Sequence, residues 1–324
     1  MPPVDVETNY TMLQGTFVIR YTDTPDAGPQ PDGDTVKFQP DDVTSLGALA
    51  RPSGQPPAIS SHGVSVRLEA IDALELHYGD AHQELAGATT ARDELLDRLG
   101  FRNVVFFPDR PNLVQRADQD AVRGHVMTNG VDANGRLIAF VYPGRHPLAD
   151  GSRVELDEAM VDGSVNARLL ADGAVYPAFY ETLPAGLRDH LATTSRRARL
   201  TTPSLGIWGR STADPDGAAT VVDRASLEQL VVWPKLFRRI VSYLGSGVDD
   251  FDGLDSWLRA DPIHRDDGLE LLDRSQAGRL HDVVRGVGHQ VQLMYWPEEF
   301  AIRPDPAPVA SVAAPSGAAA VATA

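Results

Sequence analysis

Alternating apolar and polar residues in the first half of the chain are typical of β-strands. In residues 64–71, small or apolar residues alternate with polar ones at the period of two expected for a half-buried strand. Residues 122–128 and 137–142 flank Asn134-Gly135, a pair preferred in type I′ turns, and therefore predict a β-hairpin. Further strands are predicted over residues 15–21, 35–38 and 103–107.

Helical patterns lie between and after these strands. Apolar side chains of residues 81–99 share one helical face, and Gly100 is a typical C-terminal stop. Residues 223–244 repeat apolar residues at helical spacing, and Pro234 is expected to kink or divide that helix. Shorter elements are predicted over residues 165–170, 184–200 and 251–259 (helices) and over residues 289–295 and 300–303 (a small β unit).

These elements divide the chain into four segments. Residues 1–14 are expected to be a loose lead-in, and residues 15–210 to form the main domain. A spacer rich in Ser, Asp, Pro and Gly leads to residues 220–303, for which we expect a small, mostly helical domain of unknown role. Residues 304–324 are rich in Ala, Pro and Val and are expected to be a disordered tail.

The composition indicates a folded protein of about two domains. A chain of 324 residues with 42% hydrophobic residues can bury a substantial core. The absence of cysteine excludes disulfides, thiolate catalysis and cysteine-based zinc sites. The net charge of −16, from 29 basic and 45 acidic side chains, argues against non-specific affinity for polyanions. A nucleic-acid substrate would therefore need a locally positive cleft or a bridging cation.

The N-terminal residues and the hydropathy of the chain bear on its location. The first residues contain neither the basic nor the apolar region of a signal peptide. No run of about 18 apolar residues is present, so we expect no membrane span. We expect a cytoplasmic protein by default, or a secreted one if a leader has been removed.

Acidic and arginine side chains cluster at predicted strand ends and turns. Two of them precede the strand at 35–38, three belong to or follow the strand at 64–71, and one follows the hairpin turn. In chain order they are Asp32, Asp34, Arg67, Asp72, Glu75 and Arg136. Each alone has a simpler reading, for example Arg67 as a surface arginine paired with Glu69. Together they supply the carboxylates and guanidiniums that metal-assisted hydrolysis of a phosphoester requires.

The order and spacing of these residues resemble the staphylococcal-nuclease (thermonuclease) family. The resemblance rests on Asp32-Gly-Asp-Thr35, on the Arg-x4-Asp-x2-Glu pattern that ends at Glu75, and on Gly135-Arg136 after a hairpin turn. It covers roughly residues 15–208 and closes at Trp208. It implies an α+β, β-barrel-rich fold, namely a five-stranded OB-fold barrel with about three helices. It also implies a Ca²⁺-dependent endonuclease that hydrolyses DNA or RNA with little sequence preference.

The resemblance further implies a calcium site. Asp34 and Asp72 match the two metal carboxylates of the family, and Ala73 matches the residue that lends a backbone carbonyl. The family has Thr at that position, but the carbonyl survives the change to Ala. Asp32 corresponds to an acidic neighbour of the metal.

Three further residues receive catalytic roles from the resemblance. Glu75 matches the residue that acts as general base or positions the attacking water. Arg67 and Arg136 match the arginines that bind the phosphate and stabilise its transition state, because planar guanidinium forks suit phosphate oxygens.

The chain departs from the family where the substrate is held. Ala133-Asn134 stand in the place of a Lys-Tyr pair that contacts a terminal phosphate, and the aromatic residues that pack on the base are only partly matched, by Phe179 and Tyr180. Stacking on an aromatic ring is worth about 1–3 kcal/mol per base, so we expect a raised KM rather than a lowered kcat.

Alternatives stay open at this point. The barrel could be a non-catalytic OB-fold module that binds single-stranded nucleic acid or a protein partner, or it could hydrolyse a non-nucleic phosphodiester. Arg196, Arg197 and Arg199 near the end of the predicted helix 184–200 either complement its dipole or contact DNA. Residues 220–303 could serve targeting or dimerisation.

Overall fold

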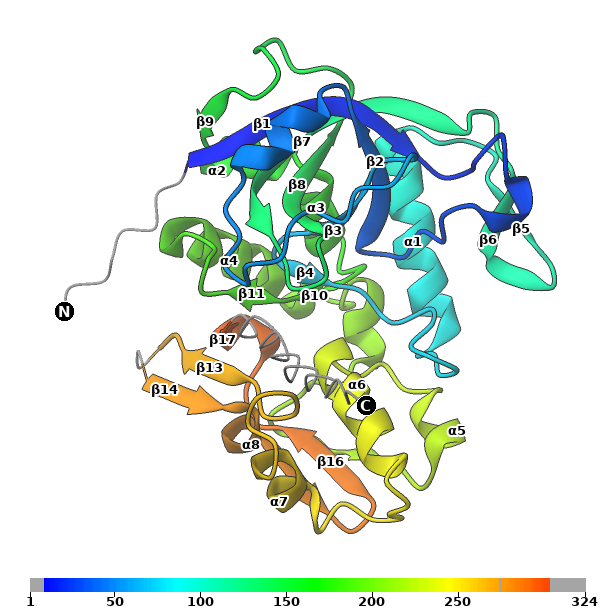
Figure 1. Ribbon diagram of the computed structural model, residues 1–324. Coiled ribbons are helices and arrows are strands. Elements are labelled where there is room, and N and C mark those ends of the chain that lie inside the picture. Colours follow the sequence, from blue (N-terminus) through cyan, green and yellow to red (C-terminus); the bar gives the residue numbers. More distant parts are fainter. Residues whose placement is uncertain (1–8, 274–275, 304–324) are drawn as a thin grey trace, which may run out of the picture.

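A computed structural model describes residues 9–273 and 276–303, and a β-barrel forms the centre of its N-terminal part (Figure 1). The barrel strands are β1 (Asn9–Val18), β2 (Thr35–Pro40), β3 (Val64–Leu68), β7 (Ala121–Val131) and β8 (Leu137–Pro143). They pair in the order β2-β3-β8-β7-β1, and β1 pairs again with β2, which closes the barrel. Strands β3 and β8 are parallel, whereas the other barrel pairs are antiparallel. This closed five-stranded barrel is consistent with an OB-like fold.

The predicted alternation of β3 is confirmed and orients its arginine. Val64, Val66 and Leu68 are buried in the barrel, and the residues between them are more exposed. Arg67 therefore projects away from the barrel core. Because β3 pairs with β8 in parallel, with Val66 opposite Leu137, the residue just before β8 lies beside the same wall.

Helices and short strands cover the barrel on its outside (Figure 1). The helices are α1 (Leu85–Leu99), α2 (Glu158–Gly163), α3 (Val165–Ala171) and α4 (Ala185–Leu200), with 3₁₀ turns at Pro25–Ala27, Val43–Ala48 and Gly206–Arg210. The short strands are β4 (Ile71–Asp72), β5 (Val105–Phe107), β6 (Arg110–Arg116), β9 (Arg153–Glu155), β10 (Tyr176–Pro177) and β11 (Phe179–Tyr180).

Two local contacts explain where these helices end and dock. Gly100 follows α1 with a left-handed backbone (φ 105°), which confirms the predicted helix stop. Asn166 at the start of α3 is fully buried. Its side chain accepts a hydrogen bond from Val141 N at 3.0 Å and donates to the carbonyls of Glu69 (2.9 Å) and Ala139 (3.0 Å). The helix is thereby fixed to the barrel at β8 and at Glu69, the residue that follows β3.

The C-terminal region is a mixture of helices and strands. Its elements are β12 (Ala219–Thr220), α5 (Arg224–Leu227), α6 (Pro234–Leu244), α7 (Leu254–Arg259), β13 (Gly268–Leu271), β14 (Gln276–Arg279), α8 (Leu280–Val283), β15 (Val284–Val287), β16 (Gln290–Leu293), a 3₁₀ turn at Pro297–Glu299 and β17 (Phe300–Ile302). The expectation of a mostly helical domain is not confirmed, because β13 pairs with both β14 and β17, and β16 pairs with both β15 and β12. Pro234 divides the predicted helix, as expected, and begins α6.

The C-terminal region shares a hydrophobic core with the barrel domain. β17 pairs in parallel with β11, with Phe179 opposite Ala301. Trp208, the last residue of the family resemblance, belongs to the same buried cluster as Trp233. The ring of Trp233 packs on that of Phe300 with centroids 5.2 Å apart. The two parts of the chain are therefore packed together rather than joined only by a linker.

Several boundary predictions change in the structure. Strand β1 begins at Asn9, so the expected lead-in contributes to the barrel from that residue onward. Arg199 of α4 pairs with Glu298 at 2.7 Å and stacks on the ring of Trp296. Arg199 therefore contacts the C-terminal region, which neither of the two predicted roles, complementing the helix dipole or contacting DNA, had included. The predicted tail, residues 304–324, and residues 1–8 lie outside the described part of the chain. Among the described residues, no helix is long and apolar enough to cross a bilayer.

Candidate functional site

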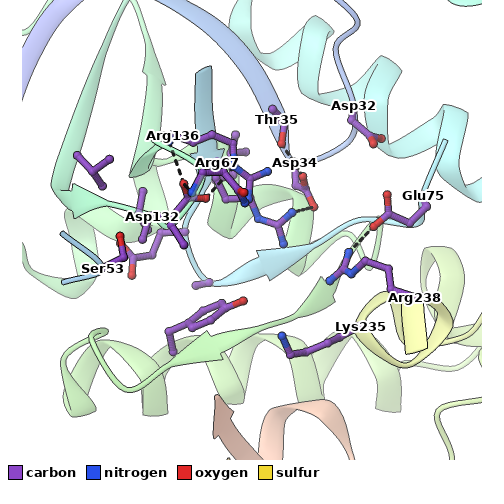
Figure 2. A pocket seen from close by; sticks show the side chains of 18 of the residues that line it. Asp32, Asp34, Thr35, Ser53, Arg67, Glu75, Asp132, Arg136, Lys235 and Arg238 are labelled. Atoms are coloured by element: carbon purple, nitrogen blue, oxygen red, sulfur yellow. Dashed lines mark hydrogen bonds and ion pairs between the residues drawn. The ribbon is translucent and has the colours of Figure 1, made fainter. Parts of the chain in front are cut away.

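A cavity of about 500 Å³ lies between the barrel wall and α6 (Figure 2). Its lining combines both signs of charge from distant parts of the chain. The charged lining residues are Asp32, Asp34, Arg67, Glu69, Glu75, Asp132, Arg136, Lys235, Arg238 and Arg239. Five of the six charged residues singled out from the sequence are in this set, and the sixth, Asp72, lies directly behind two of them.

A tight turn holds Asp34 at the start of β2. The backbone N–H of Asp32 donates to the carbonyl of Thr35 at 3.1 Å. Gly33 packs so closely that an added Cβ would lie 2.6 Å from the Cβ of Ala73, and a larger residue would push the turn away. In this position Asp34 Oδ2 accepts a hydrogen bond from Ala73 N at 2.9 Å, and Oδ1 accepts one from the Thr35 hydroxyl at 2.9 Å.

Arg67 bridges the two carboxylates that the resemblance assigns to the metal. Its Nη1 lies 2.9 Å from Asp34 Oδ2, and its Nη2 lies 2.5 Å from Asp72 Oδ1. Both carboxylates are almost completely buried, with 5% and 2% of the side chain exposed. The alternative pairing of Arg67 with Glu69 does not occur, since Glu69 Oε2 is buried with no hydrogen-bond partner.

A second guanidinium reaches the same carboxylates from α6. Arg238 Nη2 lies 2.9 Å from Asp72 Oδ2, and Nη1 contacts Glu75 Oε1. Figure 2 shows Arg238 pointing from α6 toward Glu75 across the cavity. Because Arg67 and Arg238 cover Asp72, that residue is only 1% exposed and does not line the cavity. Nothing in the pattern of α6 distinguished Arg238 from any other helical arginine.

The carboxylates of the site carry opposite pKa shifts. Burial opposes ionisation of Asp72, but the charges of Arg238 and Arg67 outweigh it and lower the pKa of Asp72. Burial and the neighbouring charges of Asp34 and Glu75 raise the pKa of Asp32 well above its usual value. Burial also raises the pKa of Glu75, although Arg238 partly offsets this. The lowered pKa of Asp72 thus reflects its two guanidinium partners, whereas burial is the main cause of the raised pKa of Asp32 and Glu75.

Arg136 lies on the hairpin that ends the neighbouring wall of the cavity. Its Nε is 2.7 Å from Asp132 Oδ2, and its backbone N–H donates to Asp132 Oδ1 at 2.9 Å. Within the described part of the chain, the side-chain hydrogen bond of Arg136 is made through Nε, and the residue lines the cavity. The turn differs from the predicted type I′ form. Gly135 N donates to Asp132 O at 3.0 Å, and only Gly135 has positive φ (77°), which places Ala133 and Asn134 at the turn centre.

Only one of the two predicted base-contacting aromatic residues faces the cavity. Tyr180 lines it, with the amino group of Lys235 6.0 Å from the ring centroid. Phe179 is fully buried in the hydrophobic core, because adjacent residues of a strand face opposite sides. The expectation that Phe179 contacts substrate is therefore wrong. Ala133 and Asn134 line the cavity at the predicted phosphate-binding position.

The donor set of the site suits a hard cation. Among the described residues, no group of three or more His, Cys, Asp or Glu side chains is arranged to hold a metal ion. The set implied by the resemblance is smaller, with two carboxylates and the Ala73 carbonyl, and leaves other ligand positions to water and substrate. Asp34 and Asp72 converge on one cationic group, Arg67, which lies 2.9 and 2.5 Å from their oxygens. Oxygen ligands of this kind are compatible with a hard cation such as Ca²⁺.

Comparison with known proteins does not add a family. No protein-family model matches the chain, and no curated protein matches it. The class that the fold defines is thus an OB-like barrel protein with an acidic and arginine-rich cavity.

Proposed function

We propose that the chain is a Ca²⁺-dependent endonuclease of the thermonuclease type. The observation that supports this proposal is the meeting of Asp34, Arg67 and Glu75 at one wall of a cavity, with Asp72 directly behind Arg67 and Arg136 at the neighbouring strand end. These residues come from three separate segments of the chain. Their residue types, order and strand context are those of the thermonuclease resemblance, and the closed barrel suits the same fold.

The proposed cation site consists of Asp34, Asp72 and the carbonyl of Ala73. These residues would hold Ca²⁺, and the bound ion would supply Lewis-acid stabilisation of the phosphoryl charge. Binding through Asp34 Oδ2 and Asp72 Oδ1 requires these two oxygens to give up their contacts with Arg67. Arg238 keeps its contact with the other oxygen of Asp72, Oδ2. The same exchange frees the Arg67 fork for a substrate phosphate.

The catalytic groups act on a water and on the phosphate. Glu75 accepts a proton from the attacking water, and its raised pKa makes it a stronger base than an ordinary carboxylate. Arg67 and Arg136 donate hydrogen bonds to non-bridging phosphate oxygens, whose charge grows in the transition state. Arg136 lines the cavity and hydrogen-bonds to Asp132 through Nε, which supports this role.

The proposed substrate is a single-stranded or frayed nucleic acid held weakly. Tyr180 offers one ring for a base, and Ala133-Asn134 provide no cation for a terminal phosphate. The net charge of −16 adds long-range repulsion, which makes capture depend on ionic strength and on Ca²⁺.

A fluorescence assay tests the proposal. A short single-stranded DNA with a fluorophore and a quencher at its ends is mixed with purified protein in Ca²⁺ or in chelator. We expect signal growth only with Ca²⁺, and none with Glu75→Gln, which also controls for contaminating nuclease. Cleavage that persists in the chelator or in Glu75→Gln would contradict the proposal.

One observation favours a second candidate, a non-catalytic OB-fold module that binds single strands or a protein. Both oxygens of Asp72 are held by guanidiniums, so the acidic residues could serve only to order the barrel wall. In that case the labelled strand would bind, as seen by fluorescence anisotropy, without being cut. Cleavage of bis(p-nitrophenyl) phosphate but not of DNA or RNA would instead indicate a non-nucleic phosphodiester as substrate.

A further inference from the structure

The C-terminal region reaches the proposed active site through one side chain. Arg238 lies on α6, more than 160 positions from the acidic residues that it contacts. Its two terminal nitrogens both contact carboxylates, Nη2 that of Asp72 at 2.9 Å and Nη1 that of Glu75. Nη1 also lies 3.4 Å from the other oxygen of Asp72. The guanidinium therefore links the proposed base to a neighbouring carboxylate.

The backbone of Glu75 is tied to the same region by a buried amide. Glu75 N donates a hydrogen bond to Gln83 Oε1 at 3.1 Å, and Gln83 Nε2 donates one to the carbonyl of Val232 at 2.8 Å. Gln83 is completely buried. Both the main chain and the side chain of Glu75 are thus connected to the segment at the start of α6.

Helix α6 is itself held firmly. Lys235 Nζ and Arg239 Nη2 each lie 2.8 Å from a carboxylate oxygen of Asp267, which is 1% exposed. Phe237 is fully buried in the core that the C-terminal region shares with the barrel domain. A helix anchored on both its charged and its apolar face can hold an attached guanidinium in a fixed place.

We propose that Arg238 is a positioning residue for Glu75, and that residues 220–303 are an integral part of the active site. The inference rests on the proposed nuclease function. Glu75 has three side-chain rotations, and a carboxylate that must orient one water loses rate when it samples other positions. The planar fork of Arg238 fixes it against Asp72 in a way that a lysine, a single point charge, does not.

The contacts of Arg238 and Arg136 differ in a way that distinguishes a residue that positions Glu75 from one that binds phosphate. Both terminal nitrogens of Arg238 contact carboxylates, whereas the hydrogen bond of Arg136 to Asp132 is made through Nε. Loss of Arg238 is therefore expected to lower kcat, and loss of a phosphate contact to raise KM.

The closing experiment compares the full-length wild type with Arg238→Ala and Arg238→Lys. On the labelled single strand with Ca²⁺, both variants are expected to lose about 100-fold in kcat with KM within about twofold. Guanidinium chloride at millimolar concentration restores part of the rate of Arg238→Ala, because it can occupy the vacated position. The control is Arg259→Ala, whose exposed side chain pairs with Asp255 and which should match wild type.

A second readout does not need turnover. Protein labelled with ¹³C at the glutamate carboxyl carbons gives a Glu75 signal, identified by its absence in Glu75→Gln. Relaxation of that signal should report an ordered carboxylate in wild type and a mobile one in Arg238→Ala. If Arg238→Ala does not fold, as judged by its melting curve, Arg238→Lys supplies both readouts.

The outcomes separate the two proposals. Failure of the wild type to cleave any substrate overturns the proposed function, while the order of Glu75 still decides whether Arg238 positions it. A raised KM with unchanged kcat, wild-type kinetics in both variants, or a Glu75 signal that stays ordered without Arg238 would overturn the positioning role.

Discussion

Replacing Glu69 with glutamine is expected to change how the stability of the protein depends on pH. Glu69 follows β3 and lies beside the cavity, yet its side chain is only 3% exposed and its Oε2 has no hydrogen-bond partner. Burial raises the pKa of Glu69 to about 8, although an interaction with Asn129 lowers it slightly. The folded protein therefore keeps a proton on Glu69 that the unfolded chain has already released at neutral pH.

The size of the effect follows from that difference in pKa. The pKa of Glu69 rises from 4.5 to about 8 on folding. As the pH rises, the free energy of unfolding therefore falls by at most about 5 kcal/mol because of Glu69, and about 3 kcal/mol of this loss is reached at pH 7. The contribution of Glu69 to the free energy of unfolding therefore decreases as the pH rises. The folded state binds more protons than the unfolded state between these two values, so wild-type stability falls as pH increases through that window.

Urea unfolding of wild type and Glu69→Gln between pH 4 and pH 9 measures the effect. Glutamine resembles the protonated acid but does not titrate, so the variant should gain stability relative to wild type as pH rises from about 4.5 to about 8. Below that window the difference between the two proteins should be constant. A difference in unfolding free energy that does not change with pH would refute the reasoning.

Three further predictions concern the cavity and its support. The double change Ala133→Lys with Asn134→Tyr adds a phosphate contact and a base contact, and should lower KM by about tenfold while kcat stays within about twofold. Steady-state cleavage of a single strand measures both constants. An unchanged KM would count against the assigned substrate position. Arg136→Lys should lower kcat/KM by about 100-fold, because a point charge replaces a planar fork that can bind two phosphate oxygens. The melting temperature should change little, because Arg136 makes one partly exposed ion pair, with Asp132. Near-wild-type cleavage would remove Arg136 from the site. Arg199→Ala should lower the free energy of unfolding, measured in urea, by about 3 kcal/mol, because it leaves the fully buried Glu298 unpaired. The KM for DNA should not change. A raised KM without loss of stability would instead support a DNA contact.

Much of the barrel could be predicted from the sequence because its signals are local. The period-two pattern of β3, the glycine stop after α1 and the proline that begins α6 each act within a few residues. The convergence of Asp34 with Arg67 also followed, although only from resemblance, since spacing along the chain does not set distances across a barrel. The turn type before Arg136 was missed because Asn-Gly also fits a longer hairpin loop with glycine in the left-handed region.

The rest of the site depended on tertiary contacts that no local pattern encodes. Arg238 reaches Asp72 only because α6 packs on the barrel domain through a shared core. The burial of Phe179, and not of Tyr180, depended on which side of a two-residue strand faces the core. A small β unit was predicted over residues 289–295 and 300–303, where β16 and β17 lie. The strands β13, β14 and β15 and the pairing of β17 with β11 were not predicted.

Calcium titration calorimetry tests the central claim most directly, namely that Asp34 and Asp72 form one cation site opposite the arginines. We predict one Ca²⁺ bound per chain in wild type, and an affinity at least about tenfold weaker in Asp34→Asn, because one of two anionic ligands is lost. Equal calcium affinity in wild type and Asp34→Asn, or no binding to either, would contradict the account.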